Sequence, residues 1–91
     1  MPSRPSFDRY DEAAALEAVQ VALTEVGDGS SYVWYRRGGR LSGIVQPTQS
    51  FIDTFGRVCR QLIVTLSSEG KSRQTDAIGC RRADGHWVID G

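Results

Sequence analysis

Two cysteines are the residues of this chain whose type and spacing predict a definite chemistry, a disulfide bond. Cys59 and Cys80 are the only cysteines, and they lie at equal distances from the predicted turn Glu69-Gly70. If a two-residue loop joins the flanking strands, Ser68 pairs with Lys71, and the cysteines face each other nine steps further out. An odd offset gives a non-hydrogen-bonded pair with Cα atoms about 4.5 Å apart, a separation that a disulfide tolerates. The sequence therefore predicts one cross-strand disulfide.

A disulfide has consequences for stability and for location. Closing a loop of about 20 residues stabilises a small domain by on the order of 3 kcal/mol. Disulfides persist in oxidising compartments, which favours the periplasm or the outer membrane. The 91 residues contain neither the apolar run of a signal peptide nor a stretch long enough to span a bilayer. We expect a trimmed mature segment of an envelope protein, and a cytoplasmic protein if the chain is complete.

Arginines and aromatic residues are interleaved around one predicted turn, a composition that can stack bases or bind anionic groups. They are Tyr32, Trp34, Tyr35, Arg36, Arg37 and Arg40. Because side chains alternate along a strand, Tyr35 and Trp34 take opposite faces, and we expect at least one aromatic ring in the core. The predicted contact residues are Tyr35, Arg36, Arg37 and Arg40, and the predicted partner is another envelope protein or an anionic envelope polymer.

Two other binding functions remain as alternatives. The same arginine and aromatic face could bind nucleic acid or another polyanion, but the formal net charge of zero disfavours a nucleic-acid partner. An inhibitor of a secreted hydrolase has a similar size and a similar covalent cross-link, yet no reactive loop is identifiable in this sequence.

Residues that could catalyse a reaction are sparse. His86 is the only histidine, and Asp84 lies two positions before it, but a zinc site needs three or four ligands and the cysteines are assigned to the disulfide. The sequence has no nucleophile elbow and no phosphate-binding glycine loop followed by Lys-Ser or Lys-Thr. We therefore expect no enzyme, no cofactor, no metal and no small-molecule substrate.

The elements that position these residues form one predicted α+β domain over residues 1–91. An extended leader (1–7) precedes a helix (8–27), and an antiparallel sheet of four or five strands follows (30–90). The helix has an apolar stripe at helical spacing: Ala15, Leu16, Val19, Ala22, Leu23 and Val26. Gly27 is predicted to end the helix in the left-handed conformation.

The sheet is predicted as a meander, because short runs rich in Val, Ile, Tyr, Trp and Thr are each closed by glycine. The predicted strands are 32–36, 41–46, 57–66, 73–82 and 86–89, with an uncertain connection at 49–55. Pro47 is predicted to end the second strand because it has no N–H to donate. Trp87 is predicted to be a core residue.

Two arginines fall on the apolar side of the predicted hairpin. Val58, Leu62, Val64 and Leu66 share one parity that should cover the helix, and Arg60 has the same parity. Arg81 lies diagonally beside Arg60 across the hairpin. Both arginines need acidic or carbonyl partners. The first 29 residues carry two basic and six acidic side chains, a net charge of minus four, so the carboxylates of the helix are the expected candidates.

The pattern of these residues resembles a known family. It comprises Trp34, Gly43 in a Leu-Ser-Gly-Ile-Val run, Cys59-Arg60, Gly79-Cys80-Arg81 and Asp84-Gly85-His86-Trp87. These positions resemble the C-terminal domain of bacterial outer-membrane surface antigens of the rickettsial seventeen-kilodalton type, over about residues 16–89. The resemblance implies an envelope location, with a lipoprotein signal and a glycine-rich stretch before the domain, and membrane attachment only through such an anchor. It implies no catalytic residues.

Overall fold

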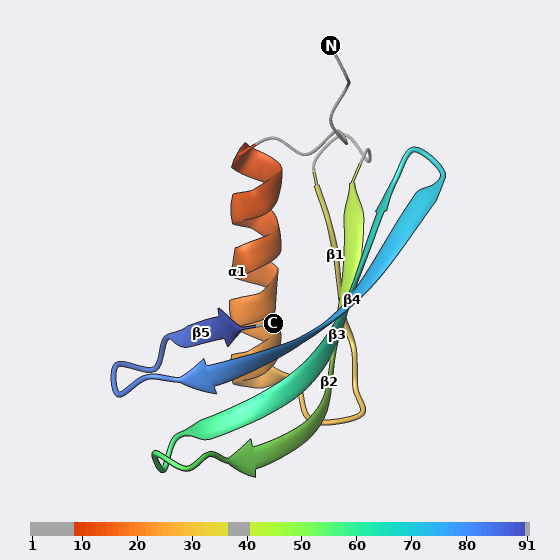
Figure 1. The fold of residues 1–91 in the computed structure, drawn as a ribbon. Coiled ribbons are helices and arrows are strands. Elements are labelled where there is room, and N and C mark those ends of the chain that lie inside the picture. The colour runs from red at the N-terminus through yellow and green to blue at the C-terminus, as the bar shows by residue number, and fades with distance from the viewer. Residues whose placement is uncertain (1–8, 37–40, 91) are drawn as a thin grey trace.

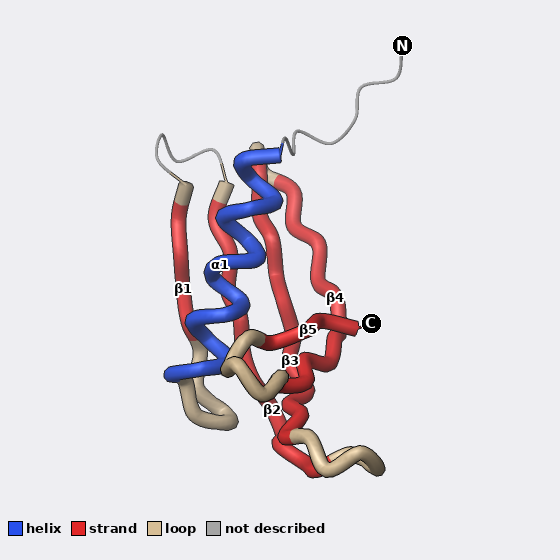
Figure 2. The backbone as a smooth tube through the Cα atoms, turned by 90° about the vertical axis from the view of Figure 1, so that its left-hand side faces the viewer, coloured by secondary structure: helices blue, strands red, loops and turns tan. Residues whose placement is uncertain are grey.

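The computed structural model describes residues 9–36 and 41–90, and the fold is the predicted α+β class (Figure 1). One helix, α1 (Arg9–Glu25), is followed by five strands: β1 (Tyr32–Tyr35), β2 (Ser42–Ile52), β3 (Val58–Ser68), β4 (Lys71–Arg81) and β5 (Trp87–Asp90). The strands pair antiparallel in chain order within one sheet. The helix lies against one face of this sheet, and β5 runs beside only part of β4 (Figure 2).

Helix α1 forms because its alanines, leucines and glutamates favour helix and because one side of it can be buried. Its buried residues are Ala18, Val19, Ala22 and Leu23. The predicted stripe was wrong at Leu16, which is 56 % exposed. Ala18 is buried instead, and Ala14 and Ala15 also pack against the core, so the buried side of the helix is rotated away from Leu16.

The helix ends differently from the sequence expectation. The left-handed glycine is Gly29, with φ 88°, whereas Gly27 does not adopt a positive φ. The N–H of Val26 still donates to the carbonyl of Ala22, and the N–H of Gly29 donates to the carbonyl of Pro47 at 2.8 Å. The chain therefore turns at Gly29, and the same residue hydrogen-bonds the segment after the helix to β2 of the sheet.

Strand β2 does not stop at Pro47, as the sequence analysis expected. Pro47 pairs with Leu62 inside the β2–β3 ladder, and the register shifts between Pro47 and Gln49. The pairing of β1 with β2 ends at Val45, so the missing N–H of Pro47 falls on the side where β1 no longer runs. Proline is tolerated there because that side of β2 is an edge.

The core lies between α1 and the sheet. Beyond the buried helix residues, it contains Trp34, Leu41, Val45, Leu62 and Trp87. The predicted parity of β3 is confirmed for Leu62, while Val58, at the end of the strand, is 38 % exposed. Two glycines let bulky side chains approach the sheet: the indole of Trp34 lies over Gly43, and Leu23 lies over Gly79.

Candidate functional site

The predicted disulfide is confirmed. Cys59 and Cys80 are directly opposite each other in the β3–β4 ladder, their Cα atoms are 4.0 Å apart, and their sulfurs are bonded. Ser68 pairs with Lys71 around the two-residue turn, as expected. The bond lies on the sheet face opposite α1, and Cys59 is completely buried there.

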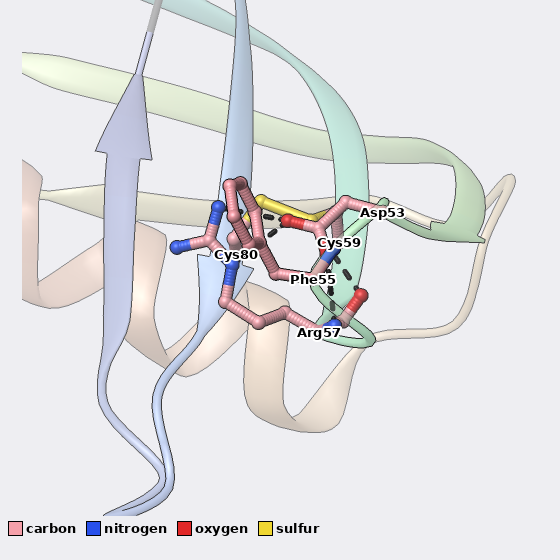
Figure 3. The surroundings of a disulfide bond; sticks show 5 residues. All are labelled: Asp53, Phe55, Arg57, Cys59 and Cys80. Carbon is pink, nitrogen blue, oxygen red and sulfur yellow. Dashed lines mark hydrogen bonds and ion pairs between the residues drawn. A yellow bond between two sulfur atoms is a disulfide. The ribbon is translucent and has the colours of Figure 1, made fainter.

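The β2–β3 turn packs beside the disulfide (Figure 3). One carboxylate oxygen of Asp53 accepts the backbone N–H groups of Phe55 and Arg57, at 2.9 and 2.8 Å. The other accepts the Nε–H of Arg57 at 2.8 Å, and the guanidinium also lies over the Phe55 ring. The backbone N–H of Arg57 is the main reason that the pKa of Asp53 lies below its ordinary value.

Asp53, Cys59 and Cys80 form the one group in the described part of the chain that brings three potential metal-ligating side chains together. The carboxylate of Asp53 and the two sulfurs lie within 4.8 Å of one another. Bonded sulfurs are not the thiolates that zinc requires, and the carboxylate is already paired with Arg57. The chemistry of this group is therefore that of a buried covalent cross-link.

Among the residues whose side chains the structure describes, Arg60 is the most deeply buried charged residue, at 8 % exposure. Its guanidinium donates to the carbonyl of Leu23 in the last turn of α1 at 2.7 Å and to the carboxylate of Asp28 at 2.7 Å. The expectation of acidic or carbonyl partners is confirmed for Arg60, but the carboxylate that reaches it is Asp28, just beyond the helix, and not one of the helix itself. The cation thus binds both a carbonyl at the negative end of the helix dipole and a carboxylate.

Asp28 is held in its ionised form by this contact. The hydrogen bond from Arg60, with further hydrogen bonds from Ser50, holds the pKa of Asp28 below its ordinary value. The Ser50 hydroxyl donates to the same carboxylate at 2.9 Å. The helix exit, β2 and β3 are therefore joined by one polar cluster. Arg81, the other arginine of the predicted pair, is exposed in the structure.

Trp87 is in the core at 4 % exposure, as predicted, and its backbone is bound by the helix. The side-chain amide of Gln20 donates to the carbonyl of Trp87 at 2.6 Å and accepts the N–H of Trp87 at 2.9 Å. Gln20 thus takes the place of a neighbouring strand along the outer edge of β5. Sequence reasoning missed this contact, since the two residues are 67 positions apart and no local pattern joins them.

Of the predicted contact residues, Tyr35 and Arg36 lie at the far edge of the sheet, at the end of β1. Tyr35 is 73 % exposed, and Arg36 is half-buried. Arg37 and Arg40 lie outside the described residues. Trp34 is buried at 8 %, which confirms that the aromatic residues are divided between the two faces.

His86 and Asp84 form a turn. The backbone N–H of His86 donates to the Asp84 carboxylate at 2.9 Å, and both residues are exposed. This hydrogen bond is the main reason that the pKa of Asp84 lies below its ordinary value. The contact orders the β4–β5 turn.

A hollow that sequence reasoning did not find lies over three strands. Its volume is about 440 Å³, and it is lined by Thr48 of β2, residues 61–63 of β3 and residues 76–78 of β4. The register shift after Pro47 lies beside it, and the only sequence signal for that shift was a proline within a strand-like run.

The fold and the disulfide define a small cross-linked α+β domain, and the comparisons with known proteins give its family. The chain belongs to the 17 kDa outer membrane surface antigen family, whose model matches residues 21–88. It is 29 % identical over 83 residues to the 17 kDa surface antigen of Rickettsia bellii, covering 91 % of this chain and 52 % of that protein. The resemblance noted in the sequence is thereby confirmed.

Other relatives give the same result. The 17 kDa surface antigen of Rickettsia prowazekii is 29 % identical over 82 residues, covering 90 % of this chain and 52 % of the relative. That of Rickettsia rickettsii is 28 % identical over 83 residues, with 91 % and 52 % covered. The chain thus spans about half the length of these relatives. No solved structure matches it. Within the described residues, α1 is too short and too polar to cross a membrane.

Proposed function

We propose that this chain is a non-catalytic structural or binding module of the bacterial cell envelope. The observation that carries this proposal is the family match over residues 21–88, to proteins described as outer membrane surface antigens. The disulfide between Cys59 and Cys80 supports it, because such bonds persist in oxidising compartments.

The envelope location is tested by fractionating cells that express the natural full-length gene. The protein should be recovered with the periplasm or the outer membrane, and a thiol assay under non-reducing conditions should find no free cysteine. Recovery in the cytosol with two free thiols would contradict the proposal, since glutathione and thioredoxin keep cytosolic cysteines reduced.

We further propose that the turn after β1 is the contact surface, through Tyr35, Arg36, Arg37 and Arg40. Tyr35 presents an exposed ring that can contribute contact area, and the arginines supply positive charge for an anionic polymer or an acidic protein surface. The placement of Arg37 and Arg40 rests on their positions in the sequence.

The test is a charge reversal with a matched control. The Arg37→Glu/Arg40→Glu variant should lose retention on immobilised lipopolysaccharide, an anionic envelope polymer, and capture of an envelope protein by pull-down. The Arg81→Glu/Arg82→Glu variant changes the net charge equally at the other side of the sheet, and it should keep both. Both variants should melt near the wild-type temperature. Equal binding by the two variants would remove this turn as the contact surface.

A further inference from the structure

One stretch of β4 has a neighbour on only one side. Along Lys71–Ala77 the strand pairs with β3, and β5 pairs with β4 only from Ile78 to Arg81. Lys71 closes the hairpin and is bonded to Ser68, so the backbone groups of alternate residues point away from β3. These residues are Ser72, Gln74 and Asp76. Their three N–H and three C=O groups form a row along an exposed edge.

The contrast with β5 shows that this edge is uncovered. On β5, the outward N–H and C=O of Trp87 are both taken up by the side chain of Gln20. No side chain of the described residues does the same for Ser72, Gln74 or Asp76. The other free edge of the sheet, on β1, has a shorter row. The backbone of Arg36 is hydrogen-bonded to Leu41 across the β1–β2 pair, so by alternation only the backbone groups of Val33 and Tyr35 in β1 point away from β2.

The side chains along this edge favour an acidic occupant. The Lys71–Ala77 stretch carries two basic residues and one acidic residue. Lys71 and Arg73 share the face toward α1, while Ser72, Gln74 and Asp76 share the other. A second copy of the chain would fit the edge poorly. If two copies paired antiparallel through all three outward residues, Gln74 of one copy would lie opposite Gln74 of the other. Arg73 of one copy would then lie diagonally beside Arg73 of the other, and the two positive charges would repel.

We propose that the Lys71–Ala77 edge of β4 binds an extended acidic segment of another protein as an additional antiparallel strand. Backbone hydrogen bonds to Ser72, Gln74 and Asp76 supply the binding, and carboxylates at alternate positions of the segment face Lys71 and Arg73. The recognised pattern is Glu-x-Glu, with a basic residue three positions before the first glutamate, opposite Asp76. This edge lies across the sheet from the turn after β1, so the inference is independent of the proposed function.

The probe is the capped peptide Thr-Lys-Val-Thr-Glu-Thr-Glu, titrated into the oxidised ¹⁵N-labelled protein. In the proposed register its two glutamates face Arg73 and Lys71, and its lysine faces Asp76. The amide resonances of Ser72, Gln74 and Asp76 should shift together. A control peptide with lysine in place of both glutamates should bind about tenfold more weakly or not at all.

Two variants of β4 test the two parts of the recognition. Gln74→Pro removes an outward N–H and leaves the pairing with β3 intact, because that N–H does not face β3. It should weaken peptide binding by about tenfold or more relative to Gln74→Ala, which keeps the N–H and loses the same side-chain bond to Thr65. Arg73→Glu leaves Lys71 basic, so it should abolish the preference for the acidic peptide over the lysine peptide.

Several results would overturn the inference. One is equal binding by Gln74→Pro and Gln74→Ala when both melt like the wild type. Others are equal affinity for the acidic and the lysine peptide, shifts confined to residues outside β4, or no binding at millimolar peptide. Concentration-dependent dimerisation that Gln74→Pro abolishes would assign the edge to a second copy of the chain instead.

Discussion

Gly43 offers a sharp test of the packing between β1 and β2. It lies directly opposite Trp34 in the ladder, and the indole covers the position that a side chain would occupy. A Cβ built at Gly43 would lie 2.5 Å from Nε1, 2.6 Å from Cε2 and 2.7 Å from Cζ2 of Trp34. Ordinary contacts between such atoms are about 3.5 to 4.0 Å long. The Gly43→Ala substitution therefore forces a rigid, buried ring to move by about 1 Å.

The expected cost follows from this displacement. Overpacking a filled core costs about 1 to 3 kcal/mol, and replacing glycine by alanine within a strand returns about 0.5 kcal/mol of backbone entropy. We expect Gly43→Ala to lower the free energy of unfolding by about 2 kcal/mol. For a domain of this size, that corresponds to a Tm about 8 to 16 °C lower.

The matched control is Gly27→Ala. A Cβ added at Gly27 would have no atom within 4 Å, and the residue has no positive φ, so this alanine should be neutral or stabilise by up to about 1 kcal/mol. Urea unfolding at equal pH, followed by circular dichroism, compares the two variants. A Gly43→Ala midpoint equal to that of Gly27→Ala would refute the reasoning. So would an unchanged cost of Gly43→Ala in a Trp34→Leu background, where the clash should be relieved.

Three further predictions concern the rest of the core and the polar cluster. Reducing the Cys59–Cys80 bond should remove about 3 kcal/mol of stability and lower the Tm by roughly 12 to 24 °C, and two free thiols in the native, unreduced protein would contradict the bond. Trp87→Ala should cost about 3 to 5 kcal/mol by urea unfolding, and a wild-type emission maximum typical of exposed tryptophan would argue against the buried ring. Because the folded-state pKa of Asp28 is lowered by Arg60, its contribution to stability is present above the unfolded pKa of about 3.9 and is lost as the pH falls through the folded value. The Tm should therefore fall more steeply below about pH 4 in the wild type than in Asp28→Asn, and equal slopes would exclude this linkage.

The sequence predicted what depends on local pattern. The Glu69-Gly70 turn set the register of Cys59 with Cys80, because a two-residue loop leaves no freedom in the pairing. Trp87 followed from its size and from the strand pattern around it. The rule that proline ends a strand failed at Pro47, because β1 is short enough to leave an edge there.

Other features could not be predicted because they depend on where separate elements meet. Asp28 as the partner of Arg60 depends on the path of the chain after the helix. The bond between Gln20 and Trp87 depends on β5 lying beside α1, which no spacing in the sequence encodes. The burial of Ala18 in place of Leu16 depends on which side of the helix faces the sheet.

The position of the disulfide has a consequence for how the domain comes apart. The covalent loop encloses only the β3–β4 hairpin, whereas α1 and β5 are joined to that hairpin by packing and hydrogen bonds alone. Under mildly denaturing conditions, α1 and β5 of the oxidised chain can unfold separately. The cross-linked β3–β4 hairpin keeps its register, and the helix and the last strand can refold onto it. In native-state hydrogen exchange, the amides of the β3–β4 hairpin should therefore exchange more slowly than those of α1 and β5.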